Sequence, residues 1–277
     1  MKILAIVVGV VVTVALAALA GAFAFSDRVA DYLPSFLQPS VQGGQQLVFQ
    51  VEPDGVDLAQ ALSESITVIE RRVKDLGVRS KAEPLGQDRI VLSMAKTADV
   101  KRVIEVSTRR GRLQFRLIEV NLTPEQSVTG EPPAHAEILY VRGDRRPYSV
   151  YKRSAQTGRD LVDAQAAFDQ RTGEPVVTFR FNANGTRRFS QITQENVDKP
   201  FAIVLDNEVI SAPIIREPIL GGSGQISGSL TVKDANDMAI QLRSGELPGR
   251  LTVIEQKASD SLNMRSPNRA LLMRSDV

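Results

Sequence analysis

The chain opens with a long apolar segment. Residues 3–25 consist of Ile, Leu, Val, Ala, Gly and Phe with a single Thr, and they carry no charge. A helix of this length spans about 34 Å, which is enough to cross the roughly 30 Å of hydrocarbon in a bilayer. We therefore predict a transmembrane anchor over residues 1–26. A cleaved secretory signal is the alternative, although the apolar region of such a signal is normally about 7–15 residues long.

The charges around this segment predict its orientation. Lys2 precedes the apolar run, whereas Arg28 after it is offset by Asp27 and Asp31. Because positive charge favours the cytoplasmic side, we expect a cytoplasmic N-terminus and an extracytoplasmic body. No later apolar run approaches the ~18 residues of a second span, so we predict a single-pass topology with a linker over residues 27–41.

Residues 42–120 alternate between the two periodicities of regular structure. Leu47, Phe49 and Val51 occupy every second position, as expected for a half-buried strand, and later apolar residues recur with helical spacing. The segment predicts strand, helix, strand, strand, helix and strand over residues 43–51, 57–76, 78–82, 90–94, 97–111 and 112–119. This order is typical of a ferredoxin-like unit, which we call the base.

The last turns of the first predicted helix are charged. They contain Glu70, Arg71, Arg72, Lys74 and Asp75. A binding patch is one interpretation, but basic residues near a helix C-terminus are common on solvated faces because they interact favourably with the helix dipole. We therefore predict that these side chains face solvent.

Residues 121–230 predict a second α+β unit, which is inserted into the base and which we call the head. Its first part is rich in Pro, Gly, Thr and Glu, as is typical of a linker or long loop. Strands are predicted over residues 137–141, 148–153, 175–181, 201–205 and 208–215. The last two would form a hairpin across Asp206 and Asn207. Apolar spacing predicts a helical turn beginning near Asp163 and a helix over residues 189–197.

A glycine-rich stretch over residues 220–228 suggests comparison with loops that bind phosphate. Such a loop places its glycines directly before a helix, and in nucleotide hydrolases a Lys follows them. Here the first Lys is Lys233, and residues 225–227 lie between the glycines and the next helix like a short strand. We therefore predict a connection that returns a strand to a sheet edge, and no nucleotide or other cofactor.

The chain is predicted to return to the base over residues 231–256. Thr231 and Asp234 form a capping-box pattern at the start of a helix. A short strand over residues 251–254 follows. Residues 257–277 form a polar tail that we expect to be disordered.

Composition argues against several classes of chemistry. The 34 Lys and Arg residues nearly balance 32 Asp and Glu residues, and neither this net charge of +2 nor an aromatic content of 5% indicates a nucleic-acid partner. The absence of cysteine excludes disulfides, thiolate catalysis and Cys-based metal sites. The single histidine, His135, lies in a Pro-flanked stretch, where we expect it to be exposed and not to bind metal. No nucleophile with a base and an acid stands out, so we predict that the chain is not an enzyme.

Several long segments appear in an order shared with a known family. They are residues 150–153 (VYKR), 161–165 (LVDAQ), 173–182 (GEPVVTFRFN), 199–213 (KPFAIVLDNEVISAP) and 215–228 (IREPILGGSGQISG). With Gly43-Gly44-Gln-Gln-Leu near the start of the base, these segments resemble the SecD family of protein translocase subunits. The positions that fall on the family's motifs are Gly43, Gly44, Asp206, Gly221, Gly222 and Gly224.

This resemblance implies a fold and a role. In the family, this region has a ferredoxin-like base with an inserted head, so the expected class is α+β, with the base over residues 42–120 and 231–256 and the head over residues 121–230. The resemblance also implies a bacterial inner-membrane protein whose periplasmic part assists preprotein export. The implied partners are the SecF subunit, the SecYEG channel, unfolded preprotein and the membrane.

The sequence departs from the family after its last predicted strand. SecD proteins normally continue into five further transmembrane helices that carry acidic proton-path residues, whereas here a polar tail follows. Proton-coupled transport by this chain alone is therefore not expected. The alternative function is a truncated or stand-alone membrane-tethered scaffold without such transport activity.

A hypothesis for contact with the exported chain rests on the density of apolar residues in one segment. Val209, Ile210, Ile214 and Ile215 could bind unfolded peptide by hydrophobic contact or strand addition. Burial in the head core is the alternative explanation of the same four residues. Charged substitutions at Ile214 and Ile215 would distinguish the two, because weaker crosslinking to exported chains indicates contact and unfolding indicates core.

Overall fold

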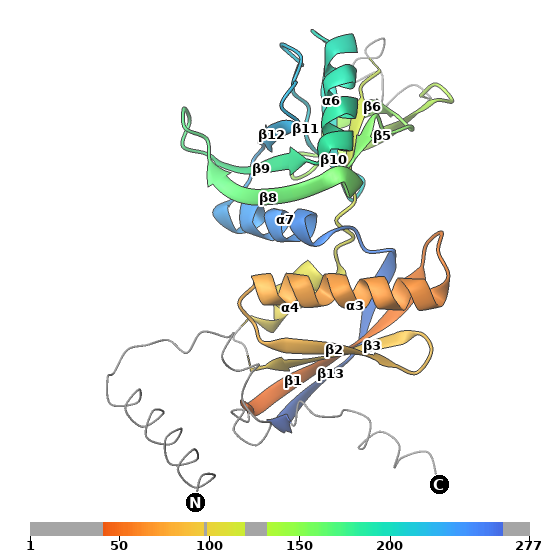
Figure 1. Ribbon diagram of the computed structural model, residues 1–277, viewed down its shortest axis with the longest axis vertical. Coiled ribbons are helices and arrows are strands. Elements are labelled where there is room, and N and C mark those ends of the chain that lie inside the picture. The colour runs from red at the N-terminus through yellow and green to blue at the C-terminus, as the bar shows by residue number, and fades with distance from the viewer. Residues whose placement is uncertain (1–40, 97–98, 120–131, 263–277) are drawn as a thin grey trace, which may run out of the picture. The chain divides into compact units, whose positions relative to one another are not determined.

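The computed structural model describes residues 41–96, 99–119 and 132–262 (Figure 1). From Gln42 onward these residues belong to one compact unit. Within the described ranges, no helix has both the length and the apolar character needed to cross a membrane. The predicted anchor over residues 1–26 lies outside these ranges, so it stays a prediction.

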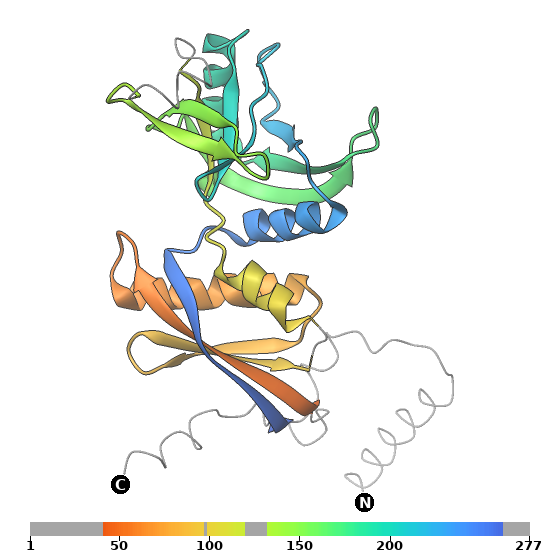
Figure 2. The same cartoon turned by 180° about the vertical axis from the view of Figure 1, so that it is seen from behind.

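A four-stranded sheet with the order β13-β1-β3-β2 forms the base. Its strands are β1 (Val41–Pro53), β2 (Ser80–Leu85), β3 (Arg89–Ala95) and β13 (Gly249–Leu262). Two helices, α3 (Leu58–Asp75) and α4 (Val100–Thr108), cover one face of the sheet (Figures 1 and 2). Leu47, Phe49 and Val51 are buried in the core of the base, as their alternation predicted.

The first predicted helix is confirmed, and the structure shows what marks its two ends. The side chain of Asp57 caps α3 by accepting a hydrogen bond from the backbone N–H of Gln60 at 2.9 Å. Gly77 follows the helix with φ +76°, a conformation that a residue with a Cβ rarely adopts. Residues close together in the sequence therefore determine where α3 begins and ends.

The fourth strand of the base is not the one that the sequence predicted. Residues 112–119 do contain a strand, β4 (Leu113–Leu117), but it pairs antiparallel with β10 (Phe201–Leu205) of the head. β13 takes the fourth place, beside β1. Alternation identifies a strand but not its partner, and Phe115 on β4 packs with the aromatic residues of the head core.

β13 is also longer than predicted. The sequence predicted a strand over residues 251–254 and disorder from residue 257, whereas β13 continues to Leu262. Its far half is polar, and Lys257 pairs with Glu255 at 2.5 Å on the same strand. Charged side chains are common on a strand at a sheet edge, so polarity alone is a poor sign of disorder there. The rest of the predicted tail lies outside the described residues.

The described residues of the head form two sheets and two α-helices. A six-stranded sheet has the order β6-β5-β11-β10-β4-β7, and a three-stranded sheet has the order β12-β9-β8. The remaining strands are β5 (Ala136–Val141), β6 (Pro147–Tyr151), β7 (Gln156–Thr157), β8 (Leu161–Phe168), β9 (Pro175–Phe181), β11 (Glu208–Ser211) and β12 (Ser223–Ile226). The helices are α6 (Ala183–Glu195) and α7 (Val232–Ser244), and a 3-10 turn covers Gly158–Asp160.

Phenylalanine side chains form the centre of the head core. The ring centroid of Phe115 lies 5.4 Å from that of Phe179, 5.8 Å from Phe181, 5.3 Å from Phe189 and 5.7 Å from Phe201. These residues come from β4, β9, α6 and β10, so one aromatic cluster joins both sheets to a helix. Buried residues of α7 belong to the same core.

The predicted helical turn near Asp163 is wrong. Residues 161–168 form β8, which pairs antiparallel with β9. The spacing of Ala164, Ala167 and Phe168 is compatible with a helix, but these residues are too few to outweigh a neighbouring strand that hydrogen-bonds their backbone. Ala164 instead faces the head core from the strand.

Two other local predictions in the head are confirmed. β10 and β11 form a hairpin, and Asp206 and Asn207 take the left-handed conformation with φ of +52° and +66°. β11 ends at Ser211, earlier than the predicted residue 215. The capping box of Thr231 and Asp234 is present at the start of α7.

The predicted boundaries after residues 120 and 230 stay predictions. Two observations favour a larger head than the sequence suggested. β4 pairs within the six-stranded sheet, and Ala235, Met238, Ala239 and Leu242 of α7 lie in the head core. The first observation places the start of the head at Leu113, and the second places its end at Ser244.

Candidate functional site

The chain passes between base and head twice. Residues 109–112 lead from α4 to β4, and residues 245–248 lead from α7 to β13. The two crossings lie side by side, because the backbone N–H of Leu247 donates to the carbonyl of Arg110 at 2.8 Å. We treat this junction as the candidate functional site, since any movement of the head relative to the base must bend these two segments.

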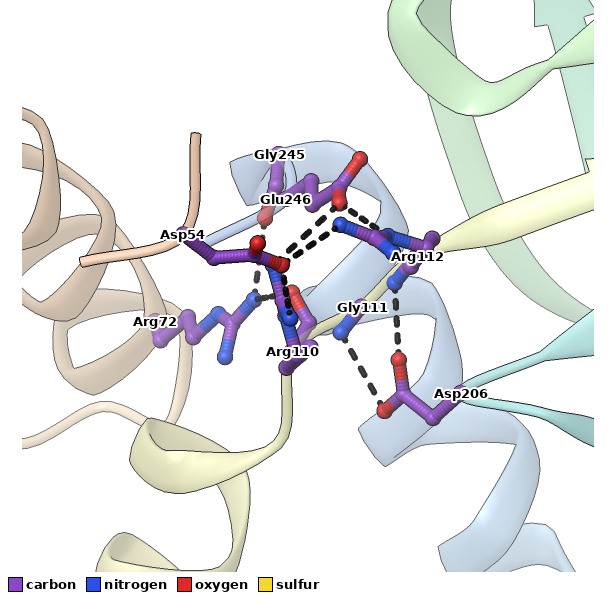
Figure 3. A network of polar contacts seen from close by, with 8 residues as sticks. All are labelled: Asp54, Arg72, Arg110, Gly111, Arg112, Asp206, Gly245 and Glu246. Carbon is purple, nitrogen blue, oxygen red and sulfur yellow. Dashed lines mark hydrogen bonds and ion pairs between the residues drawn. The ribbon is translucent and has the colours of Figure 1, made fainter. Parts of the chain in front are cut away.

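A buried arginine of the base holds both crossings (Figure 3). Arg72 on α3 has an exposed fraction of 0%. Its guanidinium donates to the carbonyls of Val106 at 2.9 Å, Arg110 at 3.2 Å and Gly245 at 2.9 Å, to the carbonyl of Arg109, and to the hydroxyl of Ser244 at 3.0 Å. Several of these acceptors lie at the C-terminal ends of α4 and α7, where carbonyls lack helical partners.

The environment of Arg72 lowers its pKa to about 10, because burial disfavours the charged form, while the carboxylate of Asp206 opposes this effect. The side chain is therefore still charged at neutral pH. The prediction that Arg72 belongs to a solvated helix face is wrong. The sequence did contain a signal, because Ala61, Ser65, Val68 and Arg72 form a second buried line on α3 at spacings of four, three and four.

A carboxylate of the head completes the junction. Asp206, in the turn between β10 and β11, accepts hydrogen bonds from the backbone N–H groups of Gly111 at 3.2 Å and Arg112 at 2.8 Å (Figure 3). Its family-motif position thus coincides with a contact to the first crossing. The sequence offered no sign of this partner, because residues 111 and 206 are far apart along the chain.

Four further charges surround the crossings. Asp54 pairs with Arg110 at 2.7 Å and with Arg112 at 3.3 Å, and Arg112 also pairs with Glu246 at 2.5 Å (Figure 3). The hydrogen bond from Arg110 is the main cause of a lowered pKa at Asp54, and the hydrogen bond to Glu246 is the main cause of a raised pKa at Arg112. All four groups are partly exposed, so each pair contributes modestly to stability.

The helix α7 connects the two parts of the fold through opposite kinds of contact. Four of its buried apolar residues, Ala235, Met238, Ala239 and Leu242, lie in the head core, which is separate from the core of the base, while Ile240 is buried outside both cores. Its charged residues reach the base helices: Asp237 pairs with Arg102 at 2.6 Å, Lys233 with Glu105 at 3.6 Å, and Arg243 with Asp75 at 2.7 Å. Head and base are thus joined largely by hydrogen bonds and ion pairs, which resembles an interface between domains that move.

The four residues suggested for peptide contact do not share one surface. Val209 is 0% exposed, and Ile210 and Ile215 are each 6% exposed, so these three lie in the core. Ile214 is 57% exposed and lies in the loop that follows β11. Only Ile214 is available for contact in this conformation.

The glycines at the family-motif positions have structural roles. Gly43 and Gly44 lie in β1, where Gly44 pairs with Ala95. Gly224 lies in β12 so close to the ring of Phe179 that an added Cβ would be 2.7 Å from it. An added Cβ at Gly222 would meet Thr186, whereas Gly221 has open space. The glycine-rich stretch therefore allows close approach between elements of the head, in agreement with a structural connection.

Substituting Gly222 by alanine should destabilise the head by about 2–4 kcal/mol. The residue has φ +62°, and the new methyl would lie 2.0 Å from the hydroxyl oxygen of Thr186. Gly221→Ala is the matched control, and its effect should be below about 1 kcal/mol. Urea unfolding of both variants measures the difference. Equal stability of the two variants would contradict the close approach.

The single histidine is exposed as predicted, but it has partners. The side chain of His135 is 53% exposed, its Nε2 lies 3.1 Å from a carboxylate oxygen of Glu119, and its ring lies 5.0 Å from that of Tyr151. Burial, followed by the hydrogen bond to Glu119, raises the pKa of Tyr151. Among the described residues, no three His, Asp or Glu side chains are placed to hold a metal ion.

The sequence of the chain is similar to those of known proteins. The family model described as "SecDF, P1 head subdomain" matches residues 136–249. The chain is 39% identical over 235 residues to the protein translocase subunit SecD of Acetobacter pasteurianus, covering 84% of this chain and 45% of that protein. It is 33% identical over 242 residues to the subunit SecDF of Brucella abortus, covering 84% of this chain and 32% of that protein. The chain thus spans less than half the length of these curated relatives.

Two solved structures resemble the fold. A crystal structure of SecDF in a super-membrane-facing form matches with a TM-score of 0.66 and 31% identity, covering 79% of this chain and 30% of that one. A structure described as a membrane component SecDF that enhances protein export matches with a TM-score of 0.61 and 31% identity, covering 76% of this chain and 98% of that one.

Proposed function

This chain belongs to the SecD family of protein translocase subunits, and we propose that it assists protein export by contacting the translocating polypeptide with its head. The observation that carries this proposal is the junction. The head has its own apolar core, and ion pairs and the buried guanidinium of Arg72 connect it to the base. A body attached in this way can change its orientation without exposing a core, as a moving part of a transport system requires.

The setting of this function follows from the family and the predicted anchor. Residues 1–26 would span the bacterial inner membrane once, with the N-terminus in the cytoplasm and the base and head in the periplasm. SecF and the SecYEG channel would be the partners, and unfolded preprotein would be the substrate. The role requires binding and movement and no covalent chemistry.

Isolation of the tagged chain from membranes tests the partners. Membranes are solubilised in mild detergent, and the proteins that copurify with the chain are identified by mass spectrometry. We expect SecF or SecYEG subunits to copurify. Their absence under conditions that preserve the rest of the channel complex would favour a scaffold that does not engage the translocation machinery.

A crosslink across the junction should abolish the effect of the chain on export. Because the chain has no cysteine, Glu105→Cys and Lys233→Cys introduce a unique pair of thiols, at positions whose native charges lie 3.6 Å apart. A short bismaleimide would then fix α7 to α4. We expect export of a secreted precursor, measured in membrane vesicles, to fall to the level without the chain.

The control shares one cysteine with the test. Lys101→Cys with Glu105→Cys places both thiols one helical turn apart on α4, so the same crosslinker reacts without joining base and head. Export should be unchanged by this crosslink. If the crosslinked test pair also supports normal export, movement at the junction is not part of the function.

A further inference from the structure

β12 lies at one edge of the three-stranded sheet. It pairs with β9 on one side, and within the part of the chain that the structure describes no strand pairs with its other side. Figures 1 and 2 show this short strand at the margin of the three-stranded sheet. Ser223 and Gln225 on it are exposed. An unpaired edge of this kind can accept another strand.

The hydrogen-bond pattern shows which backbone groups are free. The N–H of Phe181 donates to the carbonyl of Gly222 at 2.9 Å. In an antiparallel pair, bonded and non-bonded positions alternate, so Gly224 bonds to β9 while Ser223 and Gln225 direct their N–H and C=O groups away from it. The free edge thus offers two donors and two acceptors, spaced as in a β-ladder.

β12 is short, but it lacks the charge, the proline and the bulge that protect many edges. Its side chains are Ser, Gly, Gln and Ile, with no charge and no proline, and its register with β9 is continuous. The opposite edge of the same sheet, β8, is protected, because the guanidinium of Arg243 donates to the carbonyl of Ala164 at 2.9 Å and a register shift follows Leu161. The two edges therefore differ in their readiness to pair.

The surface beside β12 leaves room for the side chains of an added strand. A cavity of about 540 Å³ lies over the solvent face of this sheet, lined by Asp163, Gln165, Thr178, Arg180, Ser223 and Gln225 among others. Asp163 and Arg180 are paired positions of opposite charge, so the lining has no net preference for charge.

We propose that the free edge of β12 binds an extended segment of unfolded polypeptide by strand addition. The recognition would use backbone groups that every sequence shares, as a site for diverse exported chains requires. This inference rests on the proposed function and names the place of contact. A second copy of this chain is the competing occupant of the edge.

Hydrogen exchange of the full chain in detergent tests the site without any substitution. The probe is reduced, carboxymethylated α-lactalbumin, a polypeptide that stays unfolded in solution. We expect the amides of Ser223 and Gln225 to exchange at least about tenfold more slowly when the probe is bound. Protection confined to another surface, such as the loop of Ile214, would overturn the inference while leaving contact by the head intact.

A proline substitution tests the edge directly. Gln225→Pro removes an N–H that bonds to no strand, and the extended Gly224 before it tolerates proline. Gln225→Ala is the control, because both variants lose the 2.8 Å bond from Gln225 to Asp169. We expect binding of the probe to weaken at least about tenfold in Gln225→Pro and less than about twofold in Gln225→Ala, with similar thermal midpoints.

The remaining outcomes are equally informative. Equal binding by the two variants would overturn the inference. Failure of the probe to bind anywhere on the chain would overturn both the inference and the proposed function. Protection of β12 that depends on the concentration of the chain, without any probe, would identify a second copy as the occupant and would also overturn it.

Discussion

Replacing Arg72 by methionine is expected to lower the free energy of unfolding by about 3–5 kcal/mol. Methionine keeps much of the length of the side chain but removes every donor. The carbonyls of Val106, Arg110 and Gly245 then lose a partner in a site where Arg72 itself is 0% exposed. Because Arg110 lies in the first crossing and Gly245 in the second, the substitution should also loosen the attachment of the head.

Two measurements check this expectation. Urea unfolding gives the loss of stability, and hydrogen exchange at Gly111 and Leu247 reports loosening of the crossings. Arg72→Lys is the control, because it keeps the charge but cannot reproduce the planar fork of donors, and about half of the loss should remain. A loss below about 1 kcal/mol in Arg72→Met would show that water replaces the guanidinium and that the junction does not depend on it.

The second large effect is expected at the centre of the head. Phe115→Ala should destabilise the head by about 3–5 kcal/mol, because the residue is 1% exposed and its ring contacts those of four other phenylalanines. Phe115→Leu keeps most of the apolar volume and should cost about 1.5 kcal/mol. Thermal unfolding of the two variants measures both losses.

Hydrogen exchange of the same variant tests whether the cores are independent. The core of the base contains no residue of the aromatic cluster. Amides of β1 and β3 should therefore keep their protection in Phe115→Ala while amides of β9 and β10 lose it. Equal loss in all four strands would show that base and head unfold as a single cooperative unit.

Elements with complete local signals could be predicted from the sequence. α3 has a cap at Asp57 and a glycine after its end, α7 has its capping box, and the β10–β11 hairpin has two residues that tolerate a left-handed turn. In each case the residues that determine the structure are close together in the chain. Such signals do not depend on the rest of the fold.

Partners that are distant in the sequence could not be predicted in this way. β4 has a clear alternation, but its pairing with β10 depends on the aromatic core that forms around Phe115. Arg72 was misinterpreted for the same reason, because its acceptors come from α4 and from the second crossing. A charged residue at the end of a helix is usually solvated, and the line of Ala61, Ser65 and Val68 on the same side of α3 is too weakly apolar to outweigh that expectation.

The family resemblance contributed what periodicity could not. It indicated an inserted head and singled out Asp206, which the structure brings to the junction. It did not identify a contact surface. The four candidates for contact came from the density of apolar residues instead, and three of them are core residues, with only Ile214 exposed. The sequence did predict a short strand near residues 225–227 that returns to a sheet edge, but it did not indicate that this edge could bind a partner, because the only signal is the absence of charge in a short strand.

The base obtains its strands from two distant parts of the chain. β1, β2 and β3 precede the head, and β13 follows it. During synthesis, the ribosome therefore produces three strands long before the fourth, and one edge of β1 stays unpaired while the whole head is made. A nascent chain that stalls within the head would leave this side of β1 open to neighbouring molecules, so the arrival of β13 replaces an uncovered apolar strand at this edge by a strand whose far half is polar.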